Sequence, residues 1–166
     1  MNKLETMQKA ILDKEKSLSC RRRITHIVVH CTGGQPHQSL DSIRAHWRKL
    51  GWKNPGYHLL IDAAGNSHHL ADIDKVVNGA RNYNAHGIHI AYVGGYGNAD
   101  TRTAAQVLAL AGAITNYHSR FPEAVVCGHR DLSPDTNHNG RVDPCEWVKA
   151  CPCFDVKEAY KHIINK

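Results

Sequence analysis

The sequence has no long apolar run and nothing that resembles an export signal. Nowhere does it contain the roughly 18 consecutive apolar residues that a membrane-spanning helix needs. Its first twenty residues carry lysines and glutamates where a signal peptide has an unbroken apolar segment. Internal repeats and long linkers are also missing, so 166 residues correspond to one domain. We therefore expect a protein that is made in the cytoplasm without a signal peptide and has no membrane partner.

Positive charge and metal-binding side chains are the unusual parts of the composition. The net charge of +6 favours an anionic partner, and both nucleic acid and bacterial cell wall qualify. The chain also has 13 histidines and 6 cysteines. In a cytosolic protein this inventory indicates metal binding more than disulfide bonds. Three of the cysteines, Cys145, Cys151 and Cys153, cluster near the C-terminus.

The hydrophobic pattern predicts a mixed α/β fold, with a central mixed β-sheet flanked by helices. Short apolar or β-branched runs predict strands at 24–30, 57–61, 66–70, 88–93 and 124–127. Apolar residues at helical spacing predict helices at 39–50, at 103–117 and after Asp155. Residues 1–23 are expected to form a charged helical extension, and residues 24–166 a single domain.

Two histidines at strand ends and a later cysteine form a candidate zinc site. His30 closes one predicted strand, His129 follows another, and Cys151 lies on a loop. Catalytic zinc takes three protein ligands and keeps a position for water, whereas structural zinc usually takes four. Each histidine alone is more often structural, so the joint pattern indicates the metal. A closed structural site of His129, Cys145, Cys151 and Cys153, in a protein that binds nucleic acid, stays open as an alternative.

Four segments in a fixed order carry a family resemblance: Ile27–Thr32, Gly51–Ile61, Tyr83–Gly95 and Lys149–Asp155. They resemble the type-2 N-acetylmuramoyl-L-alanine amidases, a family of small phage amidases and peptidoglycan-recognition proteins. The similarity spans nearly the whole predicted domain, whose zinc site is then expected at the edge of the sheet. One departure lies in the central strand. Gly87 and His89 stand where family members often have a small polar residue and a glycine, which leaves substrate contacts there open.

The resemblance implies an enzyme, a zinc amidohydrolase that cleaves the amide between N-acetylmuramic acid and L-alanine in peptidoglycan. It implies His30, His129 and Cys151 as zinc ligands, and Tyr57 and Lys149 as catalytic residues. Zinc lowers the pKa of bound water toward ~7 and polarises the carbonyl. The tyrosine can donate a hydrogen bond, and the lysine can supply charge, where the oxyanion develops.

The expected biology is that of an endolysin from a phage, or of a prophage enzyme or secreted effector. Such a protein acts on the cell wall after release, as a monomer and without a nucleic-acid partner. The resemblance identifies neither a general base nor substrate-binding residues. A non-catalytic peptidoglycan-binding module of the same fold stays open as an alternative.

An insertion between His129 and Cys151 fits the calcium-loop pattern at residues 135–146. The oxygen ligands would come from Asp135, Asn137, Asn139, the Arg141 carbonyl, Asp143 and Glu146. Gly140 permits the sharp turn, whereas Pro134 argues against a normal helix entering the loop. We expect calcium as a second ion, of modest affinity, that fixes the insertion. A polar insertion without an ion is the alternative.

Overall fold

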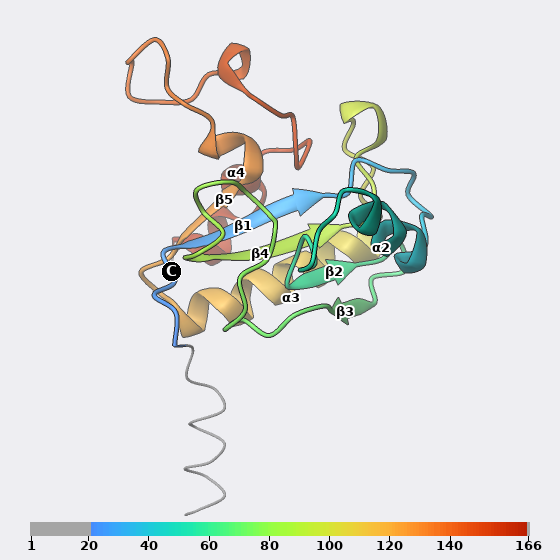
Figure 1. Ribbon diagram of the computed structural model, residues 1–166. Coiled ribbons are helices and arrows are strands. Elements are labelled where there is room, and N and C mark those ends of the chain that lie inside the picture. Colours follow the sequence, from blue (N-terminus) through green and yellow to red (C-terminus); the bar gives the residue numbers. More distant parts are fainter. Residues whose placement is uncertain (1–20, 166) are drawn as a thin grey trace, which may run out of the picture.

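A five-stranded mixed sheet forms the centre of the protein in the computed structural model, which describes residues 21–165 (Figure 1). The strands are β1 (His26–Cys31), β2 (Leu59–Ile61), β3 (Ser67–His69), β4 (Gly87–Tyr92) and β5 (Val125–Gly128). Their order is β3-β2-β4-β1-β5, and all neighbours are parallel except β2 and β3, which form an antiparallel hairpin. The predicted mixed α/β fold is confirmed.

The helices are α2 (Leu40–Lys49), α3 (Ala104–Arg120), α4 (Val156–Ala159) and α5 (Lys161–Ile164), with short 3-10 turns η1 (Tyr96–Asn98), η2 (His129–Leu132) and η3 (Pro144–Glu146). Ser39 caps α2, and Thr103 with Gln106 forms a capping box at the start of α3. None of the helices in this described part has the length and apolar character that a membrane crossing demands.

The helix predicted after Asp155 is interrupted at Tyr160, so it forms two short helices. Tyr160 has φ −121° and ψ 20°, outside the helical region, and its side chain is buried. Its ring packs edge-on against Phe154, and its hydroxyl donates to the Val107 carbonyl of α3 over 3.4 Å. Tertiary packing of this one side chain therefore overrides the helical pattern of the local sequence.

Two helical layers cover the two faces of the sheet. Figure 1 shows α3 running along one face, where it packs on Ile27, Val29 and Ile90. On the other face Ile43 and Trp47 of α2 pack on the central strands. Because side chains alternate along a strand, the even-numbered residues of β1, including His30, share the face that α2 covers.

Arg22 ties the start of the described chain to the loops beside the amino-terminal ends of β1 and β4. Its guanidinium donates to main-chain carbonyls that include those of Ile73, Lys75, Asn84, Ala85 and Gly87. Arg22 therefore contacts the domain, although it belongs to the segment 1–23 that is expected to be an extension. The helix expected there lies mainly in residues 1–20, outside the described residues.

Gln106 is a buried polar side chain whose removal should destabilise the fold. Its amide donates to the carbonyls of Ile61 and Val93, and its Oε1 accepts from the N–H of Thr103. We expect Gln106→Leu to lower the free energy of unfolding by about 1–3 kcal/mol, because buried polar groups lose their partners. Urea denaturation measures the change. Leu108→Ala, on the exposed side of the same helix, is the control and should stay within about 0.5 kcal/mol.

Candidate metal centre

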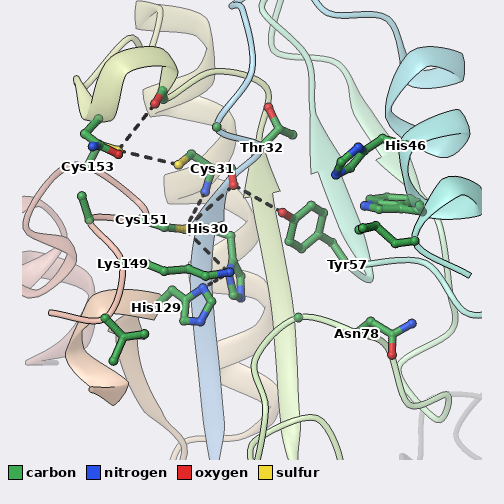
Figure 2. A pocket seen from close by; sticks show the side chains of 18 of the residues that line it. His30, Cys31, Thr32, His46, Tyr57, Asn78, His129, Lys149, Cys151 and Cys153 are labelled. Atoms are coloured by element: carbon green, nitrogen blue, oxygen red, sulfur yellow. Dashed lines mark hydrogen bonds between the residues drawn. The ribbon is translucent and has the colours of Figure 1, made fainter. Parts of the chain in front are cut away.

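The three predicted zinc ligands meet at one end of the sheet (Figure 2). His30 lies near the carboxyl end of β1, and His129 begins η2 directly after β5, the parallel neighbour of β1. Parallel neighbours end at the same edge of a sheet, so the two histidines arrive side by side. Cys151, from the loop before α4, completes the group, whose ligand atoms all lie within 4.8 Å of one another.

The geometry and protonation of this group suit a zinc ion. The Nδ1 atoms of His30 and His129 are 3.2 Å apart, and Sγ of Cys151 is 3.8 Å from Nδ1 of His30. Burial lowers the pKa of His30 well below its ordinary value and that of His129 to about 4, and the charge of Lys149 adds to both effects. Both imidazoles are neutral at pH 7, the form that binds metal. Two nitrogens and one sulfur leave a fourth tetrahedral position open.

Main-chain contacts hold the cysteine loop against the sheet. The Cys151 carbonyl accepts from the N–H of Arg130 over 2.7 Å, and the Cys151 Sγ accepts from the N–H of Cys31 over 3.2 Å. Pro152 packs on Gly128, where an added Cβ would lie 2.7 Å from the proline Cδ. The absence of a side chain at Gly128 therefore lets the loop approach β5.

Tyr57 and Lys149 line the same cavity as the ligands, which has a volume of about 670 Å³. The Tyr57 ring lies 5.2 Å from that of His30, and its hydroxyl donates to the Cys31 carbonyl over 3.3 Å. Burial raises the pKa of Tyr57, so the phenol is a protonated donor at neutral pH. Figure 2 shows Tyr57 on one side of His30, with Lys149 and His129 on the other. The cavity thus combines a metal site, a hydrogen-bond donor and a positive charge.

The cavity has a wider lining that sequence reasoning did not find. It includes His46, Asn78, Asn98 and Trp147. Each is an ordinary surface residue in the sequence, so no local signal marks it. Both Trp47 and Trp52 line the cavity. Trp47 is 8% exposed and packs in the core from α2, whereas Trp52 is 37% exposed.

The departure from the family pattern at Gly87 and His89 concerns the interior of the protein. Both residues are buried in β4, so neither faces the cavity. His89 Nδ1 instead lies 3.0 Å from Nε2 of His30, the nitrogen that points away from the other ligands. A histidine in place of a glycine marks this position in the sequence, but its contact with His30 is visible only in the structure.

The alternative closed site would need Cys145 and Cys153, which the structure places elsewhere. Cys145 is exposed on η3. Cys153 Sγ lies 3.7 Å from Cys31 Sγ, and burial raises its pKa to about 12, which disfavours the thiolate that a metal needs. Within residues 21–165, the group of His30, His129 and Cys151 is the one metal-ligand cluster of His, Cys, Asp or Glu. The arrangement therefore favours the open three-ligand site.

Hydrogen bonds within the insertion 135–146 account for its shape. Glu146 accepts from the Thr136 hydroxyl and from the N–H groups of Asp143, Asn137 and Thr136, and these bonds lower its pKa to about 2. Asp135 accepts from the N–H groups of Asn139 and Gly140. The described carboxylates of the loop form no three-membered ligand group. Calcium binding here stays a prediction from the sequence.

Comparison with known proteins identifies close similarity to one family. Residues 21–146 match the family described as N-acetylmuramoyl-L-alanine amidase, a match that ends before Lys149 and Cys151. The endolysin of Klebsiella phage KP32 is 29% identical over 143 residues, covering 82% of this chain and 85% of the endolysin. Peptidoglycan-recognition protein SC2 of Drosophila melanogaster is 30% identical over 129 residues, covering 69% of this chain and 70% of that protein.

A solved structure shares the fold. The endolysin and N-acetylmuramoyl-L-alanine amidase LysCS from Clostridium intestinale URNW superimposes with a TM-score of 0.69 and 22% sequence identity. The alignment covers 89% of this chain and 87% of LysCS. At this identity the likeness establishes the architecture alone.

Zinc binding should depend on the open site and not on the peripheral cysteines. We expect the wild-type protein to bind one zinc ion, and His30→Ala or Cys151→Ser to weaken it more than about 100-fold, since loss of an outer partner alone costs roughly 10–100-fold. Competition with a chromophoric chelator measures the affinity. Cys145→Ser is the matched control and should bind normally. Normal binding by His30→Ala, with loss in Cys145→Ser, would support the closed site instead.

Proposed function

Because the chain belongs to the N-acetylmuramoyl-L-alanine amidase family, we propose that it is a zinc-dependent enzyme that cleaves peptidoglycan between N-acetylmuramic acid and L-alanine. The observation that carries the proposal is the convergence of His30, His129 and Cys151 with Tyr57 and Lys149 around one cavity. The net charge of +6 suits an anionic, glycan-bearing polymer.

His30, His129 and Cys151 would hold the zinc ion. When bound, zinc would supply Lewis acidity that polarises the scissile carbonyl and acidifies a water molecule. The neutral imidazoles need lose no proton to serve as ligands. The N–H of Cys31 donates to the Cys151 sulfur over 3.2 Å, a bond that would help to hold this sulfur toward a bound ion.

Tyr57 and Lys149 would stabilise the oxyanion that forms when the amide carbonyl becomes tetrahedral. The phenol is buried and protonated, and it gives up only a long 3.3 Å hydrogen bond to a main-chain carbonyl when it turns to substrate. Lys149 brings a positive charge to the same cavity. Donors of this kind act strongly where charge develops and water is scarce.

Trp52 is our candidate for contact with the glycan. It is a partly exposed aromatic side chain at the cavity, and such a ring offers an apolar face to a sugar. Trp47 lies in the core and packs edge-on against Tyr57, with ring centroids 5.7 Å apart. Among the described residues the cavity lining contains no carboxylate, so no Asp or Glu is placed there as a general base.

The names of the phage relatives support the role of a cell-wall lysin. We propose that residues 24–166 form the amidase domain, with 135–146 as an inserted loop, and that the protein acts as a monomer on the wall. A non-catalytic recognition module is the second candidate, because a peptidoglycan-recognition protein is also among the relatives. Loss of the cysteine ligand would mark such a module, and this chain keeps Cys151.

Amide cleavage of purified peptidoglycan tests the proposed function. We expect zinc-loaded protein to release new L-alanine amino termini, Cys151→Ser to be inactive, and Tyr57→Phe to lose roughly 10²–10³-fold in kcat. Cys145→Ser, remote from the cavity, is the control and should keep full activity. Zinc-loaded protein that binds peptidoglycan from several sources but cleaves none of it would favour the recognition module.

Calcium binding by residues 135–146 can be tested apart from zinc. If calcium binds only the folded loop, a 100-fold excess over Kd stabilises the protein by about 2.7 kcal/mol and raises Tm by several degrees. Calcium is added to zinc-saturated, calcium-free protein, and Tm is followed by calorimetry. Glu146→Gln should abolish the increase. An unchanged Tm in the wild type at millimolar calcium would leave the loop as a polar insertion without an ion.

A further inference from the structure

Three buried imidazoles form a row that leads from the interior of the sheet to the metal centre. His58 and His89 are stacked with ring centroids 5.9 Å apart and planes 7° from parallel. His89 Nδ1 lies 3.0 Å from His30 Nε2, and His30 Nδ1 faces the other ligands. Each of the three side chains is at most 1% exposed.

Main-chain contacts fix the first imidazole of the row. His58 Nδ1 accepts from the main-chain N–H of His89 over 3.0 Å. A neutral imidazole carries one proton, so His58 has it on Nε2, where the Lys75 carbonyl accepts at 3.0 Å. Arg22 Nη1 also lies 3.2 Å from this nitrogen, but its two hydrogens are directed to the carbonyls of Ile73 and Lys75 over 2.7 Å and 2.6 Å. His58 thus supports both the backbone and the ring plane of His89 without needing a charge.

The second contact decides which nitrogen of His30 can bind a metal. A ligand nitrogen must present its lone pair, so His30 with a metal on Nδ1 carries its proton on Nε2. That proton points at His89 Nδ1, which must accept it. His89 then has its own proton on Nε2, on the side of the Tyr83 carbonyl.

Burial of the His89 ring costs free energy, because two glycines must leave room for it and one of its nitrogens lacks a partner among residues 21–165. A Cβ at Gly79 would lie 2.3 Å from His89 Nδ1, and a Cβ at Gly87 would lie 2.8 Å from His89 Nε2. Among the described residues Nε2 makes no hydrogen bond that satisfies normal geometry, although it is buried. An apolar side chain would avoid this unsatisfied donor, since removing a buried polar group can be neutral or stabilising. Packing alone therefore does not explain a histidine here.

We propose that His89 is a positioning residue of the metal centre: it accepts the Nε2 proton of His30 and so holds the His30 ring with Nδ1 directed at the ion. This inference rests on the proposed function, in which His30 is a zinc ligand. Outer hydrogen-bond partners of this kind orient ligand histidines and raise their basicity. The usual partner is a carboxylate, a carbonyl or water, and here it is a second neutral imidazole.

Zinc affinity of three variants tests the proposal without an activity assay. His89→Leu removes the acceptor at similar volume, and we expect the dissociation constant to rise roughly 10–100-fold. His89→Asn places an amide oxygen near the former Nδ1 position, so it should recover most of the affinity. Ile90→Val, the next residue on β4, is a buried control on the opposite face and should bind zinc as the wild type does. Wild-type affinity in His89→Leu, or equal loss in the Leu and Asn variants, would overturn the proposal.

The protonation pattern of the wild type provides a second test, which stands if the variants do not fold. Long-range proton–nitrogen NMR of the zinc-loaded protein should show both His30 and His89 protonated on Nε2, with His89 Nδ1 as the acceptor. A proton on His89 Nδ1 would contradict the proposal. Failure of the proposed function has a different signature, because wild-type protein would then bind no zinc or bind it independently of His30.

Discussion

The site depends on one contact, between the neutral imidazoles of His30 and His129 at the carboxyl ends of β1 and β5. The Nδ1 atoms of His30 and His129 lie 3.2 Å apart, a separation that two protonated imidazolium rings would oppose. Burial keeps both rings neutral, and parallel pairing of the strands fixes where they end. A shift of one residue in the pairing would turn His30 to the opposite face of the sheet.

Cys151 approaches the two histidines on a loop that contacts the rest of the domain at several places. Tyr92, at the end of β4, donates its hydroxyl to the Pro152 carbonyl over 2.8 Å, and Arg130 stacks on Trp147 with 4.1 Å between guanidinium carbon and ring centroid. Figure 1 shows the insertion standing out from the sheet, and its own hydrogen bonds join residues near its two ends. These bonds close the insertion three residues before Lys149.

Burial also sets the protonation of the groups that surround the ligands. The low-dielectric interior keeps His58 and His89 neutral, with pKa values lowered to about 4 and about 3, and it keeps Tyr57 protonated. Neutral rings can lie close together, and each can donate with one nitrogen and accept with the other. A row of neutral rings can therefore connect the main chain at His58 and His89 to the ring of His30. Charged rings at these distances would repel one another.

The sequence by itself determined the elements and indicated the candidate ligands. Alternating and helical hydrophobic patterns are local, so they predicted the strands, α2 and α3, and the family resemblance implied His30, His129 and Cys151, which the structure brings together. The tertiary structure alone decided what depends on contacts between distant segments. It interrupted the last helix at Tyr160, removed Cys145 and Cys153 from the ligand set, and turned His89 toward His30. The reason is physical: a pattern of hydrophobicity fixes which face of an element is buried, whereas the partner of a buried polar group is fixed only when strand order and register bring two faces together.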